Sequence, residues 1–430
     1  MARKMKDSGI EWIGEIPEGW EIVPVRSCFD EVRTKNTDGQ EQNALQFKSG
    51  NIISKTNFNA SMDDYVADTI TNYTVVLPDT VMINGLNLNY DFKSLRVALV
   101  KEKGVITSAY LAIFPDRKKI SPQYATYLFK GYETKMAFHN MGAGIRKTLG
   151  YKEFKNQPLL LPSEKEQNKI SAYLDSKCSH IDIMLSKIRS SIEEYKKLKQ
   201  AVITQAVTKG VRGEREMKDS GVEWIGEIPK EWVIQKIKSI SSRINVGVVI
   251  RPSEYFDENG TVPFLRGINV KEYLISSDNM VYINESSNRI LSKSQVHTDD
   301  ILIVRDGSIG TSCVVPAEFD GANVVSMVIA TPSISCDSRF ICYSLNSDVG
   351  KTQFTLTKIG SALTHTSVSA VSDIIVAVPS CAEQKEIADY LDAKCVEIDG
   401  LIAKKEQLVK ELESYKKSLI YEVVTGKREV

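Results

Sequence analysis

Three residues match, in type and spacing, the metal site of one class of nuclease. Asp116 follows a proline, and Glu133 and Lys135 lie two positions apart further on, as in the PD-(D/E)xK pattern. Such a set holds a divalent cation beside an attacking water. The pattern is short, and Glu133 and Lys135 fall in a predicted helix, where residues two apart face different directions. Solvated helix charges explain these residues better, and a nuclease remains an alternative only.

Other catalytic patterns are absent from the sequence. No G-x-x-x-x-G-K-[ST] phosphate loop occurs, and no G-x-G-x-x-G follows a predicted strand. The four histidines suggest no nucleophile–base pair. The seven cysteines are scattered without a C-x-x-C, which indicates reduced thiols of a cytoplasmic protein rather than disulfides or zinc ligands. We therefore expect no cofactor or metal in this chain.

Polar residues at predicted turns offer a different chemistry, the reading of DNA bases. Arginine can donate to both major-groove acceptors of guanine, and asparagine can bond adenine in the same bidentate way. Each such residue alone is more often an ordinary turn residue, but turns at the same sequence location in both halves of the chain make a stronger case. The candidates are Asn84, Asn87, Asn89, Arg146 and Lys147 in the first half, and Arg266, Asn269, Arg305, Ser361, Thr364 and His365 in the second.

Predicted strands and helices must position these turns. Alternating and apolar runs bounded by turn residues predict an α+β order of elements in both halves. In the first half they predict strands at 79–83, 95–100 and 105–114 and a helix at 121–138. In the second half they predict strands at 299–303, 312–315 and 324–332 and a helix at 338–345. The shared order indicates one fold used twice, with a different surface each time.

The chain also repeats two segments closely. Residues 5–27 and 217–239, called here the hooks, are identical at 15 of 23 positions and contain all four tryptophans. The helix openings at 162–178 and 379–395 are identical at ten of 17 positions. Tryptophan can stack on bases, but its recurrence beside an equally repeated helix favours a structural role. Two copies, rather than many, predict a pseudo-twofold molecule.

Both repeated openings begin long predicted helices. Ser163 with Glu166, and Ser380 with Glu383, have the spacing of a capping box. Apolar residues then alternate every three or four positions, which predicts an antiparallel coiled coil of about 65 Å, although packing of each helix on its own domain is the alternative. The seam residues are Leu174, Cys178, Ile181, Leu185, Ile188, Ile192, Tyr195, Val202 and Ala206, and then Leu391, Cys395, Ile398, Ile402, Val409, Leu412, Leu419 and Val423; Lys199, Lys405 and Lys416 interrupt them.

Length and charge limit the remaining possibilities. A chain of 430 residues is longer than a single hydrophobic core usually supports, so two or more domains are expected. It contains no apolar run long enough to predict a membrane span. Its net charge is zero, so any binding of a nucleic acid must depend on local basic patches or on partner chains. We expect four parts: recognition domains at 1–161 and 211–378, and helices at 162–210 and 379–430.

The two sets of repeats resemble the specificity subunit of type I restriction–modification systems. The resemblance rests on the W-I-G-E-I-P hook, on the P-S-x-x-E-Q-x-x-I helix opening with Y-L-D-x-K-C, and on the end V-V-T-G-K at 423–427. It covers nearly the whole chain. The counterpart V-T-K-G at 207–210 departs from the family's pattern because lysine and glycine are transposed.

The resemblance implies a non-catalytic subunit that binds double-stranded DNA. Each recognition domain would read one half of a split site, with half-sites about one helical turn (~10 bp) apart, and the helices would act as spacers. The implied partners are two modification subunits, which methylate adenine N6 with S-adenosylmethionine, and restriction subunits, which use ATP and magnesium. A scaffold without a DNA role is a further alternative.

Overall fold

The computed structural model describes residues 3–55, 70–92, 95–142, 147–359 and 365–430. It divides into two compact units, Met1–Arg189 with Gln407–Val430, and Ser190–Glu406. Each unit therefore contains one predicted recognition domain and a half of both long helices. Among the described residues, none of the helices combines the length and the apolar character that crossing a membrane requires.

The first unit is built around a four-stranded antiparallel sheet in the order β4-β11-β8-β9. Helix α2 packs beside β8 and β9. The sheet strands are β4 (Phe29–Glu31), β8 (Val81–Ile83), β9 (Val97–Leu99) and β11 (Leu111–Pro115). Other elements are β1 (Met5–Asp7), β2 (Glu15–Pro17), β3 (Glu21–Pro24), β5 (Leu45–Lys48), β6 (Asn51–Ser54), β7 (Thr74–Val76), β10 (Gly104–Ile106), β12 (Pro158–Leu161), α2 (Pro122–Thr134) and α3 (Tyr151–Phe154).

The second unit repeats this sheet in the order β16-β24-β21-β22. Its sheet strands are β16 (Ser241–Val246), β21 (Ile301–Val304), β22 (Ser312–Val314) and β24 (Met327–Pro332). Other elements are β13 (Met217–Asp219), β14 (Glu227–Pro229), β15 (Val233–Lys236), β17 (Val262–Leu265), β18 (Val270–Lys271), β19 (Leu274–Ile275), β20 (Val281–Ile283), β23 (Asn323–Val324), β25 (Ile375–Val378), α5 (Glu285–Ile290), α6 (Ser338–Asn346), α7 (Asp348–Ile359) and α8 (Val368–Ser372).

The two units share one topology. The hook forms an antiparallel hairpin in both, β1-β2 and β13-β14, and an antiparallel pair closes each recognition domain, β3-β12 and β15-β25. The predicted α+β fold, used twice, is therefore confirmed. The small sheets differ: β5-β6 and β7-β10 in the first unit, and β20-β17-β23 and β18-β19 in the second.

Several predicted elements are shorter than expected. The strand predicted at 324–332 is β23 and β24, because β23 pairs with β17 and only β24, from Met327, joins the main sheet. The strand predicted at 105–114 is two strands, because β10 pairs with β7 and the chain then turns before β11 joins the main sheet. The helix predicted at 121–138 ends at Thr134, since Met136 adopts a left-handed conformation with φ 51°. Helix α7 was not predicted, although the structure has it directly after α6.

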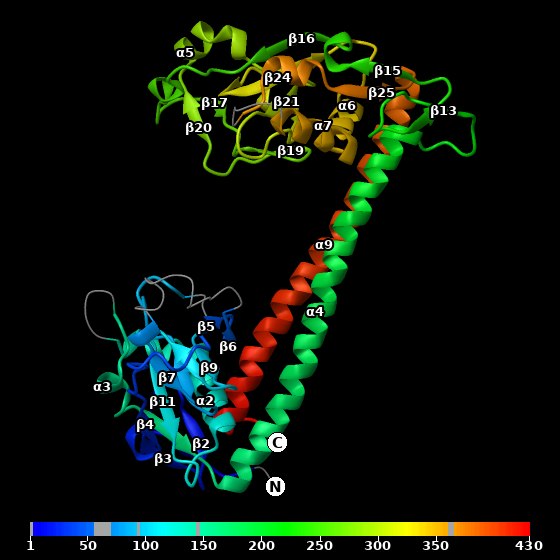
Figure 1. The fold of residues 1–430 in the computed structure, drawn as a ribbon. Helices are drawn as coiled ribbons and strands as arrows, with labels where there is room; N and C mark the ends of the chain where they lie inside the picture. Colours follow the sequence, from blue (N-terminus) through cyan, green and yellow to red (C-terminus); the bar gives the residue numbers. More distant parts are fainter. Residues whose placement is uncertain (1–2, 56–69, 93–94, 143–146, 360–364) are drawn as a thin grey trace. The chain divides into compact units, whose positions relative to one another are not determined.

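The long helices are α4 (Glu164–Lys209) and α9 (Cys381–Val424), which lie side by side (Figure 1). Every predicted seam residue is buried or half-buried. Lysines that interrupt the seam bond aspartates of the other helix: Lys199 Nζ lies 2.6 Å from Asp399 in the second unit, and Lys416 Nζ lies 2.6 Å from Asp182 in the first. These matched pairs fix an antiparallel register, as the pseudo-twofold repeat predicted.

The hooks fasten each domain to the helices through a buried tryptophan. Trp20 Nε1 donates to Glu166 Oε1 at 3.2 Å, and Trp232 Nε1 donates to Glu383 Oε2 at 3.3 Å. Both indoles are 1% exposed or less, which confirms the structural role predicted for these two tryptophans, whereas Trp224 is 38% exposed.

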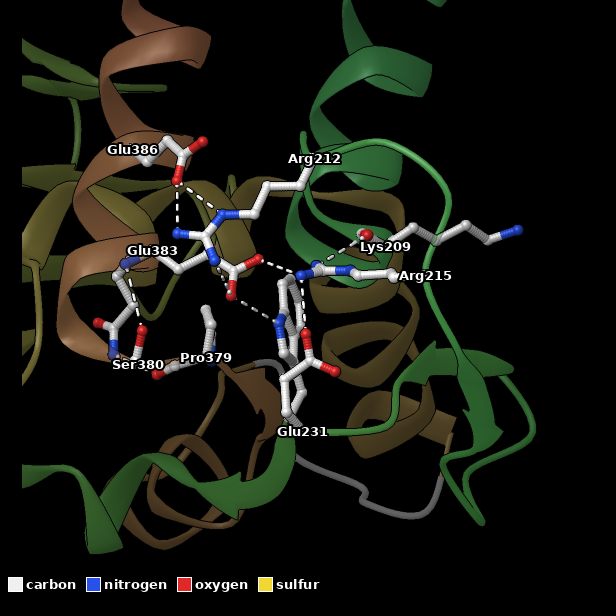
Figure 2. A network of polar contacts seen from close by, with 10 residues as sticks. Lys209, Arg212, Arg215, Glu231, Pro379, Ser380, Glu383 and Glu386 are labelled. Carbon is white, nitrogen blue, oxygen red and sulfur yellow. Dashed lines mark hydrogen bonds and ion pairs between the residues drawn. The ribbon is translucent and has the colours of Figure 1, made fainter.

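An arginine completes each hook. Arg215 stacks on Trp232 and donates to Glu383 at 2.6 Å, while Arg212 lies 3.9 Å from the same carboxylate (Figure 2). Arg3 stacks on the tryptophan of the first hook and pairs with its glutamate in the same way. Each hook core also takes in the end of the other long helix: Val423 and Val424 in the first unit, and Ala206 and Val207 in the second.

Candidate nucleic-acid interface

The structure brings two separate segments together in the first unit. The loop that follows β8, residues 84–92, is called here the first recognition loop. Leu88 N donates to Lys147 O at 3.2 Å, and Leu149 N donates to Gly85 O at 2.9 Å. A Cβ on Gly85 would lie 2.5 Å from Leu149 O, so only glycine allows this approach. The predicted asparagines and Lys147 therefore share one surface.

The same arrangement recurs in the second unit. The loop after β21, residues 305–310, is called here the second recognition loop, and it meets the segment before α8. Thr366 N donates to Arg305 O at 3.1 Å, and Arg305 Nε donates to Thr366 O at 2.8 Å. Because β8 and β21 hold the same place in their sheets, the two loop pairs are structural counterparts.

The candidates of the first loop differ in what they expose. Asn84 is half-buried, and its Oδ1 accepts from Leu86 N at 3.2 Å, so its amide shapes the turn. Asn87 and Lys147 are exposed and have left-handed backbones, with φ 52° and 35°. Asn89 is half-buried. Asn87 and Lys147 are therefore the described candidates of this loop pair whose side chains are exposed to solvent.

Two candidates of the second unit serve the turn between β17 and β18. Asn269 is fully buried; its Oδ1 accepts from Arg266 N at 3.1 Å, and its Nδ2 donates to Ser276 O and Asp278 O at 3.1 and 2.9 Å. In this conformation its side-chain amide serves the turn and is not available to a base. Arg266 is half-buried and donates to Asn279 O.

The remaining candidates lie at or beyond the edge of the described segments. Arg146, Ser361 and Thr364 lie outside the described residues. His365 is described and half-buried, next to the threonine that holds Arg305.

Comparisons with known proteins agree with this geometry. The family described as type I restriction modification DNA specificity domain matches residues 229–412. The putative type I restriction enzyme MjaX specificity subunit of Methanocaldococcus jannaschii is 25% identical to this chain, over 96% of it and 95% of the relative. The chain is thus similar to type I specificity subunits over nearly its whole length.

Two further likenesses extend over nearly the whole chain. The type I restriction enzyme MjaVIII specificity subunit of the same organism is 24% identical over 96% of this chain and 93% of the relative. A solved chain, described for complex assembly and conformational transition of the type I R-M system, has a TM-score of 0.72 at 14% identity and covers 96% of this chain and 99% of its own. The second likeness shows the fold.

Sequence reasoning missed the residue that organises the first recognition loop. Arg96 is 1% exposed, and it donates to three carbonyl oxygens of that loop: Asn84 and Leu86 through Nη1 at 2.9 and 2.8 Å, and Asp91 through Nη2 at 2.5 Å. The only signal in the sequence is a lone arginine in the otherwise apolar run Leu95 to Val100, which is weak.

The end of the neighbouring helix supports the loop in both units. Glu133 Oε1 accepts from Arg96 N at 2.7 Å, and Asn346 Oδ1, at the end of α6, accepts from Ser312 N at 3.0 Å. Burial raises the pKa of Glu133 to about 7, although Arg96 and Lys130 act in the opposite direction.

The nuclease alternative does not fit this geometry. Asp116 precedes α2 and Glu133 lies in its last turn, so they flank opposite ends of a 13-residue helix that is ~18 Å long. Glu133 is engaged with Arg96, whereas Asp116 accepts from Lys118 N at 3.1 Å. Within the described part of the chain, no cluster of three or more metal-binding side chains occurs. The metal-site interpretation is therefore wrong for these residues.

Proposed function

We propose that each unit reads one half of a split site in double-stranded DNA. The observation that carries the proposal is the recurrence of the loop pair at the same place in both sheets, on repeated hooks but with unlike residues. A shared scaffold with varied loops suits two domains that perform the same task on different sequences.

The exposed chemistry of the loops suits different bases. In the first unit, the amide of Asn87 can bond adenine, and the ammonium of Lys147 can neutralise a phosphate. In the second unit, Arg305 directly follows a buried strand, and its Nε donates to Thr366 O. This bond orients the two terminal nitrogens of the guanidinium group. A guanidinium in that position can bond guanine.

We further propose that the chemistry is done by partner chains. Two modification subunits would transfer methyl groups from S-adenosylmethionine to adenine N6, and restriction subunits would use ATP and magnesium to cleave DNA in the cytoplasm. The specificity subunit would itself be non-catalytic and would need no cofactor. The zero net charge agrees with phosphate neutralisation shared among several chains.

The test is to express the chain with its modification subunits and to map methylated adenines by long-read sequencing. We expect one motif with two specified halves and a gap of unspecified bases. A continuous motif, or no methylation at all, would sink the proposal. DNA binding that is absent or insensitive to salt in the assembled complex would favour a scaffold without a DNA role.

A further inference from the structure

A buried arginine holds the first recognition loop in one shape. Arg96 spans the loop, because its two terminal nitrogens reach carbonyl oxygens at both ends of the segment 84–91. Its guanidinium also lies 3.6 Å from a carboxylate oxygen of Asp91. These contacts fix the direction of three peptide planes with a single side chain.

Stability alone does not explain a charge in this position. A buried ion pair is often no more stable than an apolar side chain of the same volume, because both ions lose their hydration. The neighbours of Arg96 in β9 and in the adjacent strand, such as Val81 and Val97, are fully buried and apolar. An apolar side chain at this position could not bond the carbonyl oxygens of the loop, whereas the arginine does so and thereby fixes the conformation of the loop.

The outer face of the loop carries side chains suited to bases. Tyr90 is 74% exposed and Asn87 is exposed, while Phe92 stacks on His139 with ring centroids 5.1 Å apart. An exposed aromatic ring can contact a thymine methyl group or stack on a base. The arginine contacts the loop from inside, and these side chains face solvent.

We propose that Arg96 is a positioning residue for base reading, which holds the first recognition loop so that Asn87 and Tyr90 meet the DNA. The proposal rests on the function proposed above. It is asymmetric, because the second recognition loop is shorter and is tied down by its own Arg305 through Thr366. The effect of changing Arg96 should therefore be confined to one half-site.

The test uses Arg96→Lys in the full chain, assembled with its modification subunits. Lysine keeps the charge but cannot donate to three carbonyls from a planar fork. Methylation rates are measured on the cognate duplex and on duplexes with one base changed, and their ratio gives the discrimination at each position. We expect discrimination in the first unit's half-site to fall about tenfold or more, the loss of roughly one base contact, with the other half-site unchanged.

The controls separate positioning from folding. Arg117→Lys alters an exposed arginine of the same unit, which pairs with Asp79 at 2.7 Å, and should change no ratio. A smaller active fraction lowers all rates equally and leaves each ratio intact. Unchanged discrimination in Arg96→Lys would overturn the inference, whereas a wild-type complex without a split motif would overturn the proposed function itself.

Two further variants test the inference if the Arg96→Lys protein does not assemble with its partner subunits. Asn87→Asp and Tyr90→Ala lie on the exposed face of the loop, and aspartate tolerates the left-handed backbone of Asn87. Both should shift discrimination in the same half-site as Arg96. If both leave every ratio unchanged, the loop does not read bases and the inference is wrong.

Discussion

At the scale of single residues, each buried hook tryptophan bonds a glutamate of a long helix, and the two glutamates differ in their exposure to water. Glu383 is the extreme case, because its side chain is 3% exposed and accepts from both Arg215 and Trp232. Its counterpart Glu166 makes equivalent contacts with a side chain that is 34% exposed. The same contacts among arginine, glutamate and tryptophan are therefore buried in the second unit and partly exposed to solvent in the first.

This difference predicts unequal mutational effects. Glu383→Gln leaves Arg215 without its buried counter-charge, and the second unit should lose about 3 kcal/mol. Glu166→Gln, in the more solvated hook, should cost about 1 kcal/mol or less. Hydrogen exchange of hook amides, measured through increasing urea, gives the stability of each unit separately. An equal cost at both positions would contradict the prediction.

Glu133 predicts a pH dependence of the first unit. Burial raises its pKa from 4.5 to about 7, so the folded state binds more protons than the unfolded state between these values. The contribution to stability is then fully present below pH 4.5 and is lost as the pH rises through 7, with a slope of at most about 1.4 kcal/mol per pH unit.

The measurement is the difference between the wild type and Glu133→Gln. Glutamine keeps an acceptor for Arg96 N but does not titrate. The stability of the variant relative to the wild type should increase between pH 5 and pH 8. A difference that stays constant over this range would show that Glu133 does not titrate there.

At the scale of elements, the two long helices are matched by charge as well as by apolar residues. Asp399→Lys places two ammonium groups together in the seam and should lower stability by about 1 kcal/mol. The double change Lys199→Asp with Asp399→Lys should restore most of the loss. Thermal unfolding of the four proteins gives the coupling energy. The exposed pair Lys196 and Glu193 is the control, and exchanging these two residues should leave the melting temperature almost unchanged.

The helix ends account for the transposed motif. Gly210 and Gly426 both have left-handed backbones, with φ 76° and 72°, and both follow the helix end, but α4 continues to Lys209 whereas α9 stops at Val424. The order of lysine and glycine in each copy follows from where the helix ends.

Gly426 also predicts a steric effect. A Cβ there would lie 2.3 Å from Pro17 Cγ, whereas a Cβ on Gly221, with a similar φ of 71°, would meet nothing within 4 Å. Alanine at either position should cost about 1 kcal/mol for the backbone. Gly426→Ala should cost clearly more, because the hook must also move. Equal melting temperatures for the two variants would refute this.

At the scale of the whole molecule, the repeated architecture predicts that function is divided between two interchangeable modules. Replacing residues 27–158 with the corresponding segment of a type I specificity subunit keeps residues 5–26 of the first hook, the whole second hook and both helices. The new methylation motif should differ from the old one in one half only. Long-read sequencing of DNA from cells that express the original chain, and from cells that express the exchanged one, gives the two motifs. Changes in both halves of the motif would show that the modules are not independent.

The sequence predicted the repeated parts well and the varied parts poorly. Trp20, Trp232 and the helix seam recur with fixed spacing, so a physical cause common to both copies was visible without a structure. The loop residues lack such a second copy. Asn269 and Arg305 looked alike as polar turn residues, yet one is fully buried within its own turn and the other is half-buried. Only tertiary contacts separate these cases.

Arg96 shows why a site can be invisible in a sequence. Its importance comes from three carbonyl groups, and every residue type has a carbonyl, so no pattern of side chains announces the contact. Helix α7 was missed for a related reason. Its threonines and glycine have low helix propensity, and packing on α6 compensates for it.

The lysine–aspartate pairs of the long helices have a consequence for assembly. Each helix carries its aspartate and its lysine 17 residues apart, so the pattern reads the same when a helix is paired antiparallel with itself. The charges therefore cannot distinguish a helix of the same chain from one of a second chain. That choice is left to the covalent link, which gives the chain's own partner a high effective concentration. Refolding at high protein concentration should accordingly produce exchanged dimers that satisfy every one of these pairs.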